Sequence, residues 1–150
     1  MKITARNALA IFLWLAMAFA SFANTAFAQT VMQPPTGSPL RSEVLNAARP
    51  TFESETGGAI EFVVRRLNVA GDWAFGDVRL QRPGGGQIDW RKTKYAADFA
   101  GGMFDPSGSF FLVRRSDGVW TVVEFATGPT DIAWDSWRTD YKLPAALFER

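Results

Sequence analysis

Residues 110–125 constrain the fold of this chain more than any other stretch. They read Phe-Phe-Leu-Val-Arg-Arg-Ser-Asp-Gly-Val-Trp-Thr-Val-Val-Glu-Phe, two apolar runs on either side of Asp117-Gly118. An Asp-Gly pair between such runs is the strongest short-range signal for a β-hairpin. It supplies the two residues of positive φ that a type I′ turn requires. We therefore predict two antiparallel strands joined by a two-residue turn.

A second hairpin is predicted over residues 59–80, with a turn at Gly71-Asp72. Its first strand carries apolar residues on both sides of a change in phase: Ile60, Phe62 and Val64 on one face, then Leu67 and Val69 on the other. The change occurs at Arg65-Arg66 and predicts a bulge or a strong bend. Between the hairpins, residues 87–102 hold several aromatic residues and a short helix over 96–99, but no regular period.

Helices are predicted on both sides of these strands. Ser38 is an N-cap and Pro39 a first helical residue, and an apolar stripe follows at helical spacing: Leu40, Val44, Leu45 and Ala48. We expect the first regular stretch to end at Arg49-Pro50, because the residue before Pro disfavours the α region. Phe52 would extend the packing face through another turn, and Gly57-Gly58 would close the segment. A second helix is expected from Thr130 or Asp131 through Trp137.

Together these elements predict an α+β fold, in which an N-terminal helix packs on a curved four-stranded antiparallel sheet and a short C-terminal helix follows. The element order resembles the cystatin-like or NTF2-like architecture. Three short segments resemble those of small exported bacterial proteins of unassigned activity. They are Gly-Asp-Trp-Ala-Phe at 71–75, Gly-Val-Trp-Thr-Val-Val-Glu at 118–124 and Gly-Pro-Thr-Asp-Ile-Ala-Trp at 128–134. The resemblance covers most of residues 38–148 and implies a fold, but no catalytic motif.

Residues 1–28 are typical of a secretory signal peptide. Lys2 and Arg6 precede an apolar run over 8–20, and Ala26-Phe27-Ala28 is a cleavage site. The alternative is an uncleaved membrane anchor, which we disfavour because the apolar run is short for a span. We expect a flexible linker over 29–37 and one domain over 38–150, in the periplasm or secreted, with no membrane span after cleavage.

Charge and composition exclude several classes of function. The chain has 16 Lys+Arg and 15 Asp+Glu, and removal of Lys2 and Arg6 leaves 14 against 15. A nearly neutral chain has no electrostatic footprint for nucleic acid. It contains no His and no Cys, which excludes Ser-His-Asp and Cys-His catalysis and nearly all zinc sites. We predict no cofactor and no metal site.

A two-residue turn at Asp117-Gly118 fixes which residues of the first hairpin share a face. One face pairs Phe110 with Phe125, Leu112 with Val123, and Arg114 with Thr121. The other pairs Phe111 with Glu124, Val113 with Val122, and Arg115 with Trp120. We expect the first face to meet the N-terminal helix. The second would be an open, concave apolar face that forms a groove, a pocket or a dimer contact.

Three groups of residues are candidates for a site. Arg65 and Arg66, with Arg114 and Arg115, would form an anion-binding rim or a solvated edge, and Arg115 would lie over Trp120 as a cation–π pair or remain solvated. Glu124 would act as an acid or base, or form a salt bridge with an arginine. Trp134 and Trp137 would stack on a glycan or cap the sheet.

The leading prediction is a non-catalytic exported binding module of the bacterial envelope. Its binding residues would be Phe111, Val113, Trp120 and Val122, rimmed by Arg65, Arg66 and Arg115. Its partner would be an envelope protein, a small ligand or a second copy in a homodimer. The alternatives are a small NTF2-like enzyme that depends on Glu124, and a glycan-binding domain that uses Trp134 and Trp137.

Overall fold

The computed structural model describes residues 30–149 of the chain, so the predicted signal peptide lies outside the described residues. Four strands form one antiparallel sheet in the order β1-β2-β3-β4: β1 (Glu61–Ala70), β2 (Trp73–Gln81), β3 (Ser109–Ser116) and β4 (Val119–Thr127). The predicted α+β class and the four-stranded meander are confirmed. The helices are α1 (Pro39–Thr56), α2 (Ala96–Ala100) and α3 (Asp135–Asp140), and three 3₁₀ turns are η1 (Pro83–Gly85), η2 (Trp90–Lys92) and η3 (Ala145–Leu147). None of the helices within residues 30–149 has the length and apolarity needed to cross a membrane.

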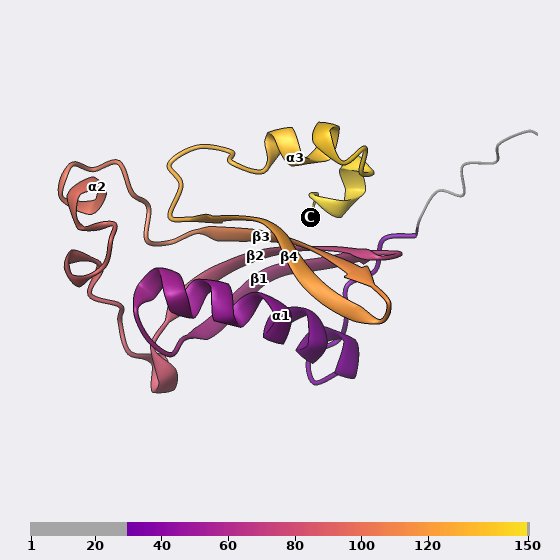
Figure 1. The fold of residues 1–150 in the computed structure, drawn as a ribbon, viewed down its shortest axis with the longest axis horizontal. Helices are drawn as coiled ribbons and strands as arrows, with labels where there is room; N and C mark the ends of the chain where they lie inside the picture. The colour runs from indigo at the N-terminus through magenta and orange to yellow at the C-terminus, as the bar shows by residue number, and fades with distance from the viewer. Residues whose placement is uncertain (1–29, 150) are drawn as a thin grey trace, which may run out of the picture.

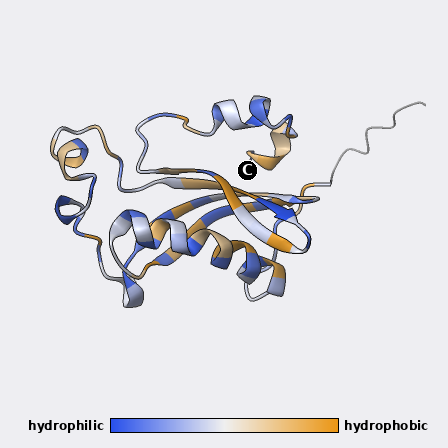
Figure 2. Ribbon diagram, viewed as in Figure 1, coloured by the Kyte–Doolittle hydropathy of each residue, from blue (hydrophilic) through white to orange (hydrophobic). Residues whose placement is uncertain are grey.

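The sheet is covered on both faces. Figure 1 shows α1 along one face, and α3 with the C-terminal segment along the other. Figure 2 shows hydrophobic residues along the strands of the sheet. Because side chains alternate along a strand, both sides of these strands can be apolar. Two core clusters result: one beneath α1, which includes Val44, Phe52, Val78, Phe111 and Val113, and one beneath the C-terminal segment, which includes Phe75, Leu112, Trp137, Leu147 and Phe148.

Helix α1 begins where the sequence predicts and continues past the break predicted at Pro50. The Ser38 side chain accepts a hydrogen bond from the backbone N–H of Arg41 at 3.3 Å, so the predicted N-cap is confirmed. The predicted break at Arg49-Pro50 is wrong, because the helix runs through Pro50 to Thr56. The expected extension at Phe52 and the close at Gly57 are confirmed, since Gly57 is the C-cap with a φ of 70°. The turn beyond Pro50 buries Phe52 completely, and this burial offsets the hydrogen bond that proline cannot donate.

The bulge predicted in the first hairpin is confirmed. Strand β1 shifts its register against β2 between Val64 and Arg66. The extra residue, Arg65, returns the later apolar residues to the face of the earlier ones. Leu67 and Val69 therefore belong to the cluster under α1, together with Ile60 and with the partly buried Phe62 and Val64. The bulge thus keeps these five apolar side chains on one face, and the expectation that Leu67 and Val69 lie on the opposite face is wrong.

The second hairpin has the predicted turn but not the whole predicted pairing. Asp117 and Gly118 have φ values of 51° and 80°, as a type I′ turn requires. The pairs nearest the turn also stand as predicted: Val113 with Val122, Arg114 with Thr121, and Arg115 with Trp120. Beyond them the register shifts, and Leu112 pairs with Glu124, Phe111 with Phe125, and Phe110 with Ala126. The predicted pairs at the base of the hairpin are wrong, because β4 carries an unpredicted bulge at Val123.

Two further expectations differ from the structure. The C-terminal helix begins at Asp135, not at Thr130 or Asp131, and Trp134 takes its N-cap position without a side-chain cap. The chain first crosses from the end of β4 to the other face of the sheet, through Gly128 at a φ of 62°. Met32, in the segment expected to be a flexible linker, forms an antiparallel bridge with Val69 on the outer edge of β1.

Candidate functional site

The face predicted to be an open binding surface lies inside the molecule. Phe111 and Val113 have no exposed surface, Trp120 is 7% exposed, and Val122 packs against the same cluster. Helix α1 covers them and places Phe52 against Phe111, with 6.2 Å between ring centroids. The expectation that α1 meets the other face was wrong, because the apolar stripe of α1 meets the face that holds Phe111. These four residues form core.

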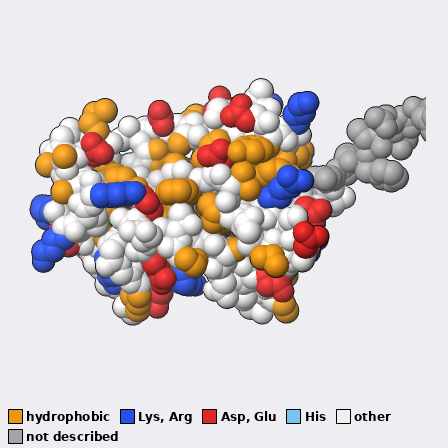
Figure 3. Space-filling view, in the orientation of Figure 1, with side chains coloured by type: hydrophobic (Ala, Val, Ile, Leu, Met, Phe, Trp, Pro, Cys, Tyr) orange, Lys and Arg blue, Asp and Glu red, His pale blue; other side chains and the backbone are white. Residues whose placement is uncertain are grey.

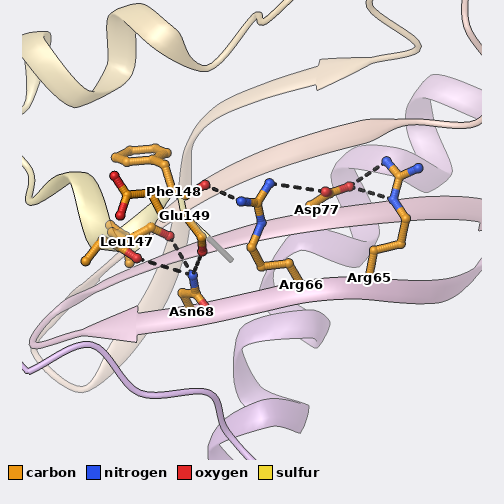
Figure 4. Close-up of polar contacts among 8 residues, drawn as sticks. Arg65, Arg66, Asn68, Asp77, Leu147, Phe148 and Glu149 are labelled. Carbon is orange, nitrogen blue, oxygen red and sulfur yellow. Dashed lines mark hydrogen bonds and ion pairs between the residues drawn. The ribbon is translucent and has the colours of Figure 1, made fainter.

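Arg65 and Arg66 do not share a rim with the arginines of the second hairpin. Both bind the carboxylate of Asp77, at 2.5 Å from Arg65 and 3.2 Å from Arg66 (Figure 4). Arg66 also donates to the main-chain oxygen of Phe148 and lies over the rings of Phe75 and Trp134. Arg66 therefore fastens the C-terminal segment to the sheet and is not available as a surface cation.

Arg114 and Arg115 lie near the tip of the second hairpin. The guanidinium of Arg115 lies 5.2 Å from the ring centroid of Trp120, so the predicted cation–π geometry is confirmed. It also binds Asp72 at 3.0 Å. Arg114 pairs with Trp73 across the sheet, four residues along β2 from Asp77, which is about 13 Å at strand rise. The four arginines thus form two separate groups.

Glu124 bonds with a tyrosine, not with an arginine. The hydroxyl of Tyr141 donates to Oε1 of Glu124 at 2.7 Å. The bulge at Val123 explains this contact, since it turns Glu124 to the face that the C-terminal segment covers. The hydrogen bond to the Glu124 carboxylate raises the pKa of Tyr141 above its ordinary value.

The two tryptophans of the glycan hypothesis pack on the sheet. Trp137 is 6% exposed and lies 6.5 Å from Phe75 between ring centroids. Trp134 is partly buried and stacks on Phe148, with 5.6 Å between the centroids and 9° between the planes. Trp137 therefore caps the sheet, and one ring face of Trp134 is already occupied.

Sequence reasoning missed a cleft at the end of the sheet. It has a volume of about 570 Å³ and is lined by Arg79 and Leu80 of β2, residues 87–91, Phe99 of α2, and Pro106-Ser107. The long connection between β2 and β3, which carries α2 (Figure 1), builds most of its wall. Ile88 and Trp90 are buried there, which explains why an aperiodic connection holds so many aromatic residues.

A buried carboxylate holds this connection against α1. Glu55 is 9% exposed and accepts hydrogen bonds from Lys94, at 2.6 Å, and from the hydroxyl of Tyr95. Burial and the hydrogen bond to Glu55 raise the pKa of Tyr95 to about 12. The ring of Tyr95 packs against Trp90, with 6.3 Å between centroids. The Glu55 contacts therefore position a wall of the cleft.

Two further surface features bear on a site: exposed hydrophobic side chains and the placement of acidic residues. Figure 3 shows hydrophobic side chains gathered across the middle of one face, between the layer of α1 and the layer of the C-terminal segment. No group of three Asp or Glu side chains within residues 30–149 could hold a metal ion. Comparisons of the chain with protein-family models, with curated proteins and with solved structures find no match.

Proposed function

We propose that this protein is a non-catalytic binding module that takes a small molecule in the cleft at the end of the sheet. The observation that carries the proposal is the cleft itself, whose volume of about 570 Å³ lies in the range of small-molecule sites. Its lining combines buried apolar side chains with a few polar groups. Ligand sites have this composition.

The cleft replaces the concave face as the proposed binding surface. A ligand cannot reach Phe111 or Val113 without displacing α1, whereas the cleft is open at the surface. A homodimer would add a second surface beside the cleft.

Location and kinship are part of the same proposal. We place the protein in the periplasm or outside the cell, on the charge and hydropathy pattern of residues 1–28. We also propose kinship with the cystatin-like or NTF2-like architecture, with a curved sheet, on the order of one long helix followed by an antiparallel meander. The ligand would then be one that the bacterial envelope contains.

The experiment that tests the proposal is a titration of the mature chain with a defined panel of acidic, basic and neutral aromatic compounds, followed by two-dimensional amide NMR. We expect shifts confined to residues 79–80, 87–91, 99 and 106–107. Ser107→Trp, which places a large ring in the cleft, should abolish them. Shifts elsewhere only, or shifts that survive Ser107→Trp, would contradict a ligand site at this position.

One observation favours a second candidate function. The hydrogen bond between Tyr141 and Glu124 provides a carboxylate and a phenol in contact, and such pairs serve in acid–base catalysis. Glu124 and Tyr141 lie outside the lining of the cleft, so Glu124→Gln should abolish turnover in such an enzyme and leave ligand binding in the cleft unchanged. The glycan alternative has less support, because Trp137 is buried and Trp134 stacks on Phe148.

A further inference from the structure

Two arginines of the cleft differ from most arginines of the described chain. Arg65, Arg66 and Arg115 each bind an aspartate, and Arg41, Arg49 and Arg82 donate to main-chain oxygens. Arg79 and Arg91, in contrast, form neither a hydrogen bond through their side chains nor an ion pair with any residue between 30 and 149. Both line the same cleft.

Local structure holds one of these guanidinium groups at the cleft. The side chain of Asp89 accepts a hydrogen bond from the backbone N–H of Arg91 at 3.3 Å and so begins the turn η2. The guanidinium of Arg91 lies 5.5 Å from the ring centroid of Phe99, another lining residue. Stacking on an aromatic ring leaves the N–H donors at the edge of the guanidinium plane free for a ligand.

The lining of the cleft carries more positive than negative charge. It holds two arginines, Arg79 and Arg91, and one acidic residue, Asp89. The carboxylate of Asp89 lies 3.6 Å from Lys92, which is outside the lining. The remaining surface of the cleft is largely apolar, with Leu80, Ile88 and Trp90 buried beneath it.

We infer that the cleft binds an amphipathic anion: a small molecule in which a carboxylate, sulfonate or phosphate is joined to a flat apolar group. Arg79 and Arg91 would take the anionic group, since a guanidinium offers paired N–H donors to such oxygens. Trp90 and Phe99 would contact the apolar group. This inference rests on the proposed function, because it assumes that the cleft is a ligand site.

A matched pair of fluorescent probes tests the inference. Anilinonaphthalene sulfonate carries one negative charge, and phenylnaphthylamine has the same ring skeleton without the charge. Wild type should bind the sulfonate about a hundredfold more tightly than the neutral compound, since each of the two charge-assisted contacts is worth about tenfold. Arg79→Gln and Arg91→Gln should each weaken the sulfonate about tenfold and change the neutral probe less than about twofold. Arg138→Gln, an exposed arginine of α3, is the control and should change neither.

The outcomes separate the inference from the proposed function. If Ser107→Trp removes both probes but the arginine substitutions leave the sulfonate unaffected, the cleft is a ligand site without the anion preference, and the inference is overturned. If both probes bind Ser107→Trp as tightly as wild type, the proposed function is overturned as well. Arg79→Gln carries the test even if Arg91→Gln disturbs the stacking on Phe99, because the Arg79 side chain has no hydrogen bond or ion pair to lose within residues 30–149. Arg91→Lys, which keeps the charge, should retain part of the preference.

Discussion

Arg66 donates a hydrogen bond to the main-chain oxygen of Phe148, which lies 82 residues further along the chain. Two residues later on the same strand, Asn68 donates from Nδ2 to the main-chain oxygens of Leu147 and Glu149, at 3.0 and 2.8 Å (Figure 4). Two side chains of strand β1 thus bind the main chain of residues 147–149. The side chains of Leu147 and Phe148 are buried against the sheet. This segment therefore covers the face of the sheet opposite α1, and that face belongs to the core.

Loss of the Asn68 contacts should destabilise the protein. Asn68 is 2% exposed, so Asn68→Ala leaves buried carbonyl groups without their donor, and we expect a loss of about 2–3 kcal/mol in the free energy of unfolding. Urea denaturation measures this loss. Asn46→Ala, at an exposed asparagine of α1, is the matched control and should change stability by less than about 0.5 kcal/mol. Equal stability of the two variants would contradict the role of Asn68.

Tyr95 should make stability depend on pH in the alkaline range. Its pKa is about 12 in the folded protein and about 10 in an unfolded chain. The folded state therefore holds the phenolic proton more tightly, so this contribution to stability is complete below pH of about 10 and is lost as the pH rises towards 12. Urea denaturation of wild type and Tyr95→Phe across this range measures it, and wild type should lose more stability than the variant.

A spectroscopic titration provides the control for this prediction. The chain has 2 tyrosines, so Tyr141→Phe leaves Tyr95 as the sole source of tyrosinate absorbance. That absorbance should rise with a midpoint near 12, well above the ordinary value. A midpoint near 10 would show that the contact with Glu55 does not hold the phenol in its neutral form.

Most of the fold could be predicted from the sequence, because turns and alternation are local signals. The turn at Asp117-Gly118 and the bulge in β1 both follow from a few neighbouring residues. The bulge in β4 left a similar trace: Trp120, Val122 and Phe125 are separated by two and then three residues, as are Phe62, Val64 and Leu67. Both triplets pack on the α1 side. In both strands, a spacing of three residues in a series of apolar residues otherwise spaced by two therefore marks the bulge.

The candidate site could not be predicted in the same way. The β4 bulge places Phe125, and not Glu124, beside Phe111 on the face that α1 covers. Without the bulge, the prediction gave that face a charge at its end and wrongly left Phe111 and Trp120 at a surface. The cleft brings Arg79 of β2 together with Arg91 and Phe99 of the connection between β2 and β3. The sequence of this connection has no regular spacing of apolar residues, and its position depends on tertiary contacts with α1 such as that of Lys94 with Glu55. Pairings between distant segments of this kind leave no local pattern in one sequence.

Deletion of Val123 tests the β4 bulge directly. If Val123 is the extra residue, its loss leaves a regular ladder in which Glu124 still pairs with Leu112 and Phe125 with Phe111. Phe125 would then keep its contact with Phe52, at 6.0 Å between ring centroids. We therefore expect urea denaturation to show a loss of less than about 1.5 kcal/mol in the free energy of unfolding. Thr121→Ala, at an exposed position of β4, is the control. A loss of about 3 kcal/mol or more, as expected if Phe125 left the core, would contradict the register.

Gly76 is predicted to be required because the ring of Phe111 occupies the space of a side chain. Gly76 pairs with Phe111 across β2 and β3, and a Cβ at this position would overlap the ring. Phe111 is fully buried and cannot move aside. Gly76→Ala should therefore cost about 1–3 kcal/mol in the free energy of unfolding, as overpacking does.

A double-mutant cycle separates this overlap from the general cost of placing alanine in the strand. Phe111→Leu alone leaves a cavity and should destabilise the protein, but it also opens space over Gly76. The two substitutions together should then cost less than the sum of the single changes, with a coupling of about 1 kcal/mol or more, as expected for residues in contact. Additive losses in urea denaturation would mean that the ring of Phe111 does not limit residue 76.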